Sequence, residues 1–178
     1  MPEHKVFFAI QPDAPSAARM IDVAEDVRRR DSLAGKATPA GRLHLSLNFV
    51  GSFRGPPPRA VIEKAATAVA GVSERPFVVA LNRVASWKGD PHPLVLAGEE
   101  GVIGAETLQA TLHRALAAVS MAPRRAPPFE PHVTLLWDRR EVAARFVEPI
   151  TWTVREFVLL DSVFGEGRQD VLGRWPLG

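Results

Sequence analysis

The sequence predicts an α+β fold with two lobes and antiparallel sheets. Short apolar runs, which are typical of strands, alternate along the chain with about three segments of helical periodicity. Near the C-terminus, pairs of such runs flank turn residues as in hairpins, and this favours antiparallel pairing. A histidine followed two residues later by a hydroxyl occurs once in each half, at His44 and Ser46 and again at His132 and Thr134. The duplication indicates two lobes that face one cleft.

Composition sets the class of protein. The chain has 178 residues, 46% of them apolar and 24% charged, and no low-complexity linker divides it, so we expect one two-lobed domain over 1–178. The net charge of +2 excludes a polybasic tail that coats nucleic acid. Most of the 22 basic residues are arginine, which suits phosphate binding, although a GC-rich genome explains this bias equally well. The chain has no cysteine, which excludes thiol nucleophiles and thiolate metal sites.

The apolar runs of the sequence do not predict a targeting signal. The apolar run near the N-terminus is too short for a signal-peptide core, and no run approaches the roughly 20 apolar residues of a membrane span. A cytoplasmic location without a membrane partner is therefore expected.

The N-terminal half is predicted to run strand, helix, strand, helix. Apolar residues are contiguous in the first strand, alternate with polar ones in the second, and recur at helical spacing in the two helices. The expected elements are a buried strand over 6–10, a helix over 16–33, a strand over 42–50 and a helix over 59–70, with a Gly- and Pro-rich connection over 51–58.

The C-terminal half is predicted to contain more strand than helix. Leucines and a valine on one stripe indicate its main helix, and β-branched and aromatic residues bounded by Gly, Pro and Asp indicate its strands. The expected elements are a strand over 77–87 interrupted near Asn82, a strand over 94–97, a helix over 102–119, a strand over 129–137, a short helix over 142–147, and closing strands over 152–160 and 169–175.

The first histidine strand has an unusual polar face. Four apolar residues alternate with His44, Ser46 and Asn48, and side chains two apart on a strand point the same way. An imidazole and a hydroxyl therefore lie side by side, and the pattern recurs at His132 and Thr134. The remaining histidines are expected to have no function: His4 and His92 as solvent residues, and His113 as a surface or core residue.

Two imidazoles and two hydroxyls suit phosphodiester cleavage. The unperturbed pKa of histidine, about 6.5, lets one ring act as a base and the other as an acid near neutral pH. Short hydroxyls can hold phosphate oxygens or orient the rings. A zinc site would need further ligands near the histidines, and a serine hydrolase would need a Gly-x-Ser-x-Gly turn. We therefore expect no metal and no cofactor.

In these motifs the chain resembles the 2H phosphoesterase superfamily, most closely the bacterial and archaeal RNA 2′,3′-cyclic phosphodiesterases, historically called 2′-5′ RNA ligases. The resemblance extends from the strand over 6–10 to the final Trp175, Pro176 and Leu177, with the two His-x-(Ser/Thr)-x motifs as its most specific part. It implies a bilobal fold with two antiparallel-rich sheets and flanking helices, arranged with pseudo-twofold symmetry around a central groove.

The resemblance also implies a reaction. An RNA-terminal 2′,3′-cyclic phosphate would be opened to a 2′-phosphate, with His44 protonating the leaving 3′ oxygen and His132 activating water. Ser46 and Thr134 would hold the phosphate oxygens. Relatives can also join RNA ends through a 2′-5′ bond without ATP. The implied partner is an RNA with a cyclic phosphate end, such as a tRNA fragment, bound by a monomer.

The chain departs from this family at two places. Relatives carry an arginine soon after the second motif, where this chain has Arg139 and Arg140 only after Asp138, and a tyrosine near the position of Gln169. Other groups must then compensate phosphate charge or stack a base. The candidates are Arg42 and Phe7, with Arg124, Arg125, Arg139 and Trp137 as further choices.

Two other functions are open to the same sequence. One is a phosphoesterase for a small cyclic nucleotide, which a deep, narrow groove would favour. The other is a nucleotide-binding module without catalysis, although binding alone does not need two proton-transfer groups.

Overall fold

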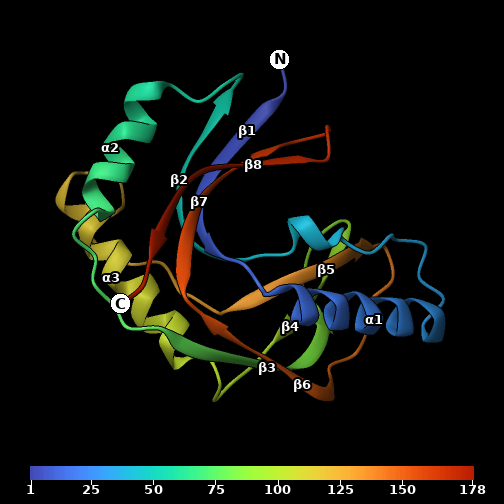
Figure 1. The fold of residues 1–178 in the computed structure, drawn as a ribbon. Helices are drawn as coiled ribbons and strands as arrows, with labels where there is room; N and C mark the ends of the chain where they lie inside the picture. The colour runs from blue at the N-terminus through green and yellow to red at the C-terminus, as the bar shows by residue number, and fades with distance from the viewer.

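The computed structural model describes residues 1–178 and contains one sheet with three helices (Figure 1). The strands are β1 (Glu3–Ile10), β2 (Leu45–Arg54), β3 (Phe77–Ser86), β4 (His92–Ala97), β5 (His132–Asp138), β6 (Arg145–Val154), β7 (Glu156–Val163) and β8 (Arg168–Pro176). The helices are α1 (Ala14–Arg30), α2 (Arg59–Val69) and α3 (Ile103–Ala118), and a 3₁₀ turn spans Ala40–Arg42. The predicted α+β class is confirmed.

The sheet has two four-stranded halves. Its strand order is β6-β3-β4-β5-β2-β1-β7-β8, and every pairing is antiparallel. The halves meet where β2 pairs with β5, and this pairing consists of Leu45 opposite Val133. The two sheets of the prediction are therefore joined into one continuous sheet through a single residue pair. Because the histidine motifs lie at this joint, each half contributes one histidine to the region around it.

Two of the helices pack across the boundary between the halves. Helix α1 follows β1 but packs on β5 and β6 of the other half, whereas α3 follows β4 and packs on β2, β3 and α2 (Figure 1). The main apolar core contains residues of the sheet and of all three helices. A second small cluster, formed by Phe7, Ala9, Val158 and Leu160, lies apart from it on β1 and β7. Alternation along these strands places the two clusters on opposite faces.

Most predicted elements are present, and their differences have tertiary causes. The interruption expected near Asn82 is a register shift between β3 and β6. The strand β2 begins at Leu45 and runs to Arg54, into the predicted connection, because β1 pairs with it along that length. His44 therefore lies immediately before the strand and not within it.

Two predictions for the C-terminal region are wrong. No helix forms over 142–147, because β6 begins at Arg145 and pairs with β3. In addition, the Val142 N–H donates a hydrogen bond to the Ser86 hydroxyl at 2.8 Å. The expected strand over 152–160 is two strands, since β6 ends at Val154 and β7 begins at Glu156 in the other half of the sheet. No helix of the structure has the length and apolar composition needed to cross a membrane.

Candidate active site

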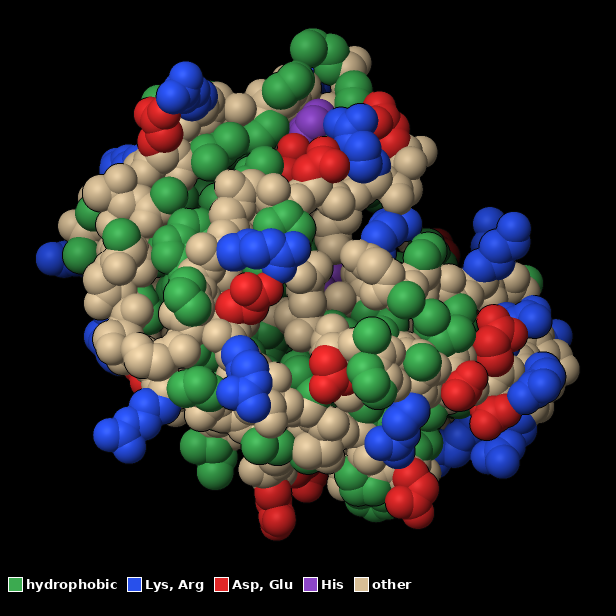
Figure 2. Space-filling view, in the orientation of Figure 1, with side chains coloured by type: hydrophobic (Ala, Val, Ile, Leu, Met, Phe, Trp, Pro, Cys, Tyr) green, Lys and Arg blue, Asp and Glu red, His purple; other side chains and the backbone are tan.

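An open groove of about 970 Å³ lies at the joint between the halves. One wall comes from the half that contains β1, β2 and β7, and the other from the residue after β3, the segment before β5 and the start of β5. The residues that line it include Lys5, Phe7, His44, Ser46, Phe49 and Ser162 on the first side and Trp87, Phe129, Glu130 and His132 on the second. In the space-filling view the surface is hollowed between the two halves, and Lys and Arg side chains lie beside the hollow (Figure 2). Both predicted catalytic histidines thus share one groove.

The two histidines are held in the same way. Nδ1 of His44 lies 2.8 Å from the Arg42 carbonyl oxygen, and Nδ1 of His132 lies 2.8 Å from the Glu130 carbonyl oxygen. A carbonyl oxygen only accepts, so each Nδ1 carries the proton and donates it. In the neutral ring the lone pair is then on Nε2, which has no partner within the protein. Each ring can therefore take up or release a proton at Nε2.

Burial and charge bias the protonation of both rings. Desolvation lowers the pKa of His44 below its ordinary value of 6.5, and the positive charges of His132 and Arg42 lower it further, against the hydrogen bond to the Arg42 carbonyl. Desolvation also lowers the pKa of His132, where the hydrogen bond to the Glu130 carbonyl and the Glu130 carboxylate act the other way. The pKa of both rings is therefore lowered in the free protein: nearby positive charge adds to desolvation at His44, and the Glu130 carboxylate partly offsets desolvation at His132.

An aromatic ring packs on each histidine. The centroid of the Phe7 ring is 5.0 Å from that of His44, and the Trp87 ring is 4.2 Å from His132. Phe7 is only 9% exposed, so it supports His44 and offers little surface for stacking a base. Trp87 was not predicted as a site residue: it directly follows β3, and only the sheet brings it beside β5.

The other predicted site residues occupy different places. Ser46 lines the groove. Thr134 follows His132 on β5, on the same side of the strand, but is not among the residues that line the groove. The Arg42 guanidinium lies against the β7–β8 turn, with Nη1 3.5 Å from where a Cβ on Gly167 would stand, and its Nε is buried without a partner. Arg42 therefore acts on His44 through its carbonyl and its charge.

The further candidates do not gather in the groove. Trp137 and Arg139 line a separate pocket with Gly35 and Asp138, and Arg124 and Arg125 are exposed in the loop before β5. Gln169, at the place where relatives carry tyrosine, does reach the site: its side-chain amide lies 3.3 Å from Nδ1 of His44.

A β-bulge changes the predicted polar face of β2. Ser46 pairs with Ala9 and Asn48 with Phe8, so Leu47 is the extra residue and the alternation reverses. Asn48 still lies at the groove beside His44 and Ser46, but it is buried and its side-chain amide donates to the Gln109 carbonyl of α3 at 3.2 Å, so its side chain does not share the face predicted for it. Phe49 instead lies opposite Phe7 in the groove and is 60% exposed.

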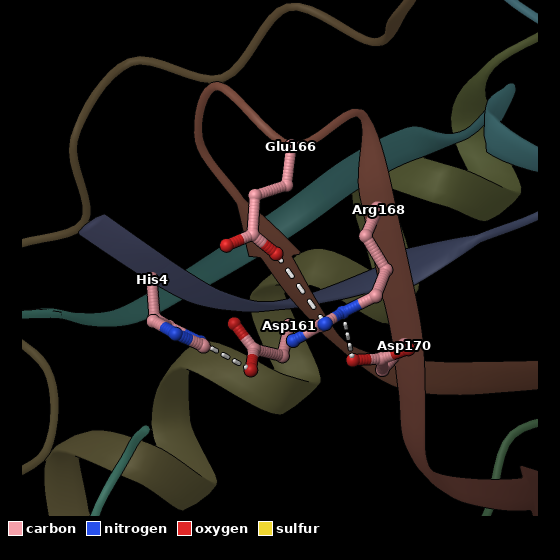
Figure 3. A network of polar contacts seen from close by, with 5 residues as sticks. All are labelled: His4, Asp161, Glu166, Arg168 and Asp170. Carbon is pink, nitrogen blue, oxygen red and sulfur yellow. Dashed lines mark hydrogen bonds and ion pairs between the residues drawn. The ribbon is translucent and has the colours of Figure 1, made fainter. Parts of the chain in front are cut away.

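The prediction for His4 is wrong. His4 is 4% exposed on β1, and its Nδ1 lies 2.7 Å from Oδ2 of Asp161 on β7 (Figure 3). Beside this pair, Arg168 forms ion pairs with Glu166 at 3.3 Å and with Asp170 at 3.1 Å, which hold the β7–β8 turn. His4 was predicted to be exposed because it lies near the chain end. The pairing of β1 with β7 buries it.

The remaining two histidines lie outside the groove, His92 half-buried and His113 buried on α3 with Nε2 unpartnered. No three His, Asp or Glu side chains lie together as metal ligands would.

Comparison with known proteins agrees with the fold. The model of the 2′-5′ RNA ligase superfamily matches residues 12–165. The RNA 2′,3′-cyclic phosphodiesterase of Escherichia coli strain K12 is 32% identical over 97% of this chain and 96% of that protein. The crystal structure of E. coli LigT in apo form superposes with a TM-score of 0.76 at 27% identity and covers 99% of both chains. The complex of E. coli LigT with 3′-AMP gives a TM-score of 0.72 at 27% identity, again over 99% of both chains.

Proposed function

The chain belongs to the 2′-5′ RNA ligase superfamily, and from that premise we propose that it hydrolyses the 2′,3′-cyclic phosphate at the end of an RNA to a 2′-phosphate. The proposal includes catalysis by the two histidines as a general acid and base, without a metal. The relative from E. coli, named an RNA 2′,3′-cyclic phosphodiesterase, supports the reaction.

One observation carries the mechanism: both Nδ1 atoms donate to a backbone carbonyl two residues earlier, at the same distance of 2.8 Å. This fixes the tautomer of each ring and leaves both Nε2 atoms available for proton transfer. Because the rings come from opposite halves of the sheet, a phosphate between them would have one Nε2 on each side. An in-line displacement needs that arrangement, with a base behind the attacking oxygen and an acid beside the departing one.

The proposed step conserves atoms and protons. The neutral His132 takes a proton from water, whose oxygen forms a bond to phosphorus as the bond from phosphorus to O3′ breaks. The protonated His44 gives its proton to O3′, and the ring protons are then exchanged with solvent. Ser46 and Thr134 are proposed to donate hydrogen bonds to the non-bridging oxygens.

These roles require His44 to be protonated when substrate is bound. In the free protein the charges of Arg42 and His132 oppose that state. The negative charge of a bound phosphate reverses the balance, because it stabilises an adjacent imidazolium. Substrate binding is therefore proposed to place the single proton of the histidine pair on His44.

The same site supports ligation in the reverse direction. In ligation, an RNA 5′-hydroxyl in place of water would give its proton to one histidine and attack the phosphorus of the cyclic phosphate. The bond from phosphorus to O3′ would break, O3′ would take a proton from the other histidine, and a 2′-5′ bond would form without ATP. A cytoplasmic location, the monomeric state, and one domain over 1–178 remain predictions.

The test is direct. EDTA-treated protein is incubated with an oligonucleotide that ends in a 2′,3′-cyclic phosphate, and the product is identified by mass and by phosphatase sensitivity. A terminal 2′-phosphate supports the reaction, its regiochemistry and metal independence together. No turnover by folded protein, with or without added divalent cations, overturns the RNA reaction. A panel of small cyclic nucleotides then tests the alternative substrate class, and binding of that panel without turnover would indicate a nucleotide-binding module.

A further inference from the structure

We propose that Phe49, Lys5 and Phe164 form a second nucleotide subsite, which stacks the base and binds the phosphate of the nucleotide that precedes the cyclic phosphate in an RNA. This inference rests on the proposed function and extends it, because it specifies an RNA chain as the substrate rather than a single cyclic nucleotide.

Phe49 and Phe164 are exposed without an obvious structural reason. Their side chains are 60% and 70% exposed, whereas Phe7, Phe8 and Phe157 in neighbouring strands are buried. Phe49 lines the groove, and Phe164 lies beside Lys5, a lysine of the same groove. Single exposed apolar residues are common, but two exposed rings on either side of one groove lysine are typical of a binding surface. Phe146 and Trp137, which are also exposed, line other pockets.

The register of the sheet places Phe49 next to the catalytic end of the groove. Phe49 lies opposite Phe7, whose ring contacts His44. It reaches this side only because the bulge at Leu47 reverses the alternation of β2. A base stacked on Phe49 would therefore be adjacent to the nucleotide whose phosphate lies between the histidines.

Lys5 continues the same surface along β1. It is two residues from Phe7 on the same side of the strand, roughly 7 Å away, and it lines the groove together with Ser162, its partner on β7. Its Nζ lies 6.0 Å from the centroid of the Phe164 ring, at the limit of a cation–π contact. Lys5 has no ion-pair partner, so its charge is available for a phosphate of the RNA backbone.

The turn that carries Phe164 is well anchored. The Phe164 N–H donates to the Glu3 carbonyl at 2.8 Å, and Arg168 pairs with Glu166 and Asp170 across the turn (Figure 3). The nearby carboxylates are engaged as well, Glu3 with the Ser52 hydroxyl at 2.6 Å and the other two with Arg168. A preorganised ring loses little freedom on binding, and paired carboxylates repel a phosphate less than free ones.

The chemistry of this surface matches single-stranded RNA. Proteins that bind single strands combine a basic group along the backbone with aromatic rings on which successive bases stack, and one stacked base contributes roughly 5- to 150-fold in affinity. Phe49 and Phe164 supply the rings and Lys5 the cation.

The test compares two substrates in the same variants: adenosine 2′,3′-cyclic phosphate and a hexanucleotide with a 2′,3′-cyclic phosphate end. For Phe49→Ala and Phe164→Ala, the ratio of kcat/KM for the hexanucleotide to kcat/KM for the mononucleotide should fall about tenfold. Phe164→Trp should keep the ratio and Phe164→Leu should not. Phe146→Ala, which removes an equally exposed ring outside the groove, is the matched control and should leave the ratio unchanged.

The outcomes separate this inference from the function on which it rests. If the wild type is active and neither Phe49→Ala nor Phe164→Ala changes the ratio of kcat/KM values, the subsite alone is overturned. A wild type that hydrolyses neither substrate overturns the proposed function. The subsite is then tested by fluorescence anisotropy with a 5′-labelled hexanucleotide ending in a 3′-phosphate, and equal Kd values for wild type and both variants overturn it too. Sedimentation that shows a dimer lost in Phe164→Ala, with the ratio unchanged, would assign the rings to self-association instead.

Discussion

Gln169, on β8, lies 3.3 Å from Nδ1 of His44 although the two residues are 125 positions apart in the chain. His132 has no such neighbour at Nδ1, whose partner is the Glu130 carbonyl. The two histidines are therefore supported in the same way by the backbone and differently by side chains. This difference offers a way to change the protonation of one ring without touching it.

Gln169→Glu should move the pH optimum of kcat/KM upward. A carboxylate next to Nδ1 stabilises the imidazolium of His44 and raises its pKa. Because the two histidines are coupled, the macroscopic pKa values on either side of the optimum rise as well. The measurement is kcat/KM from pH 4 to about 9, the range in which histidines and their neighbours titrate. Gln169→Leu, which adds no charge, is the control; an equal shift in both variants would show that geometry and not charge is responsible.

His44→Ala and His132→Ala should each lower kcat by about 10²-fold or more, the amount expected on loss of a general acid or base. Because the two rings act on one proton-transfer sequence, the double variant should lose less than the product of the two single losses. Steady-state kinetics with the cyclic phosphate substrate measures this. His113→Gln, on α3 outside the groove, should retain activity, and retained activity in either groove variant would remove that histidine from the mechanism.

The pH optimum of kcat/KM should lie on the acid side of 6.5. Burial lowers the pKa of both His44 and His132 from that value, and the active form of the free enzyme carries one proton on the pair. The optimum of such a pair lies between its two pKa values, both of which are lowered. An optimum above pH 6.5 in kcat/KM would contradict this account of the two rings.

Trp87→Ala should raise the pKa of His132 toward 6.5. Desolvation is the main cause of its lowered pKa, and the Trp87 ring, 4.2 Å away, contributes to that burial. NMR titration of the histidine ring protons in the variant measures the change. Trp137→Ala, which removes an exposed tryptophan that lines a different pocket, should leave this titration as in wild type.

Asp138→Ala should lower the free energy of unfolding by about 1–3 kcal/mol, because the buried carboxylate accepts from the Arg140 N–H at 2.8 Å and the Gly35 N–H at 2.7 Å. These hydrogen bonds lower the pKa of Asp138 below 3.8. The stabilisation is therefore complete above pH 3.8 and is lost as the pH falls through the folded-state pKa. Denaturant unfolding of wild type and Asp138→Ala at several pH values should show the difference in their free energies of unfolding shrinking in acid. A difference that stays constant would rule out this carboxylate as its source.

Much of the fold and the centre of the site follow from local patterns. Strand and helix positions were predictable because apolar spacing records which face of an element is buried. That His44 and His132 share one groove was predictable because each has a hydroxyl two residues later on a strand-like segment. The wrong predictions concern residues whose neighbours are distant in sequence: 142–147, which β3 draws into a strand, and His4, which β7 buries.

The bulge in β2 shows the limit of period-2 reasoning. By alternation alone, Asn48 belongs beside His44 and Ser46, yet one extra residue at Leu47 turns Asn48 toward α3 and Phe49 toward the groove. A bulge depends on how two strands register, and that register depends on the whole sheet. The same applies to Arg42, whose guanidinium lies against the β7–β8 turn.

The sequence by itself determined the α+β class, the two-lobed arrangement and the two imidazoles with their hydroxyls, since periodicity and motif spacing are local properties of the chain. Tertiary structure alone decided what surrounds those imidazoles. Trp87, Lys5 and Phe49 reach the groove through antiparallel pairings between strands that are remote in sequence. The same pairings bring Gln169 to His44 and Phe164 to Lys5. The physical reason is that strand pairing converts long sequence separations into contacts of a few ångströms, and no local pattern records which strands will pair.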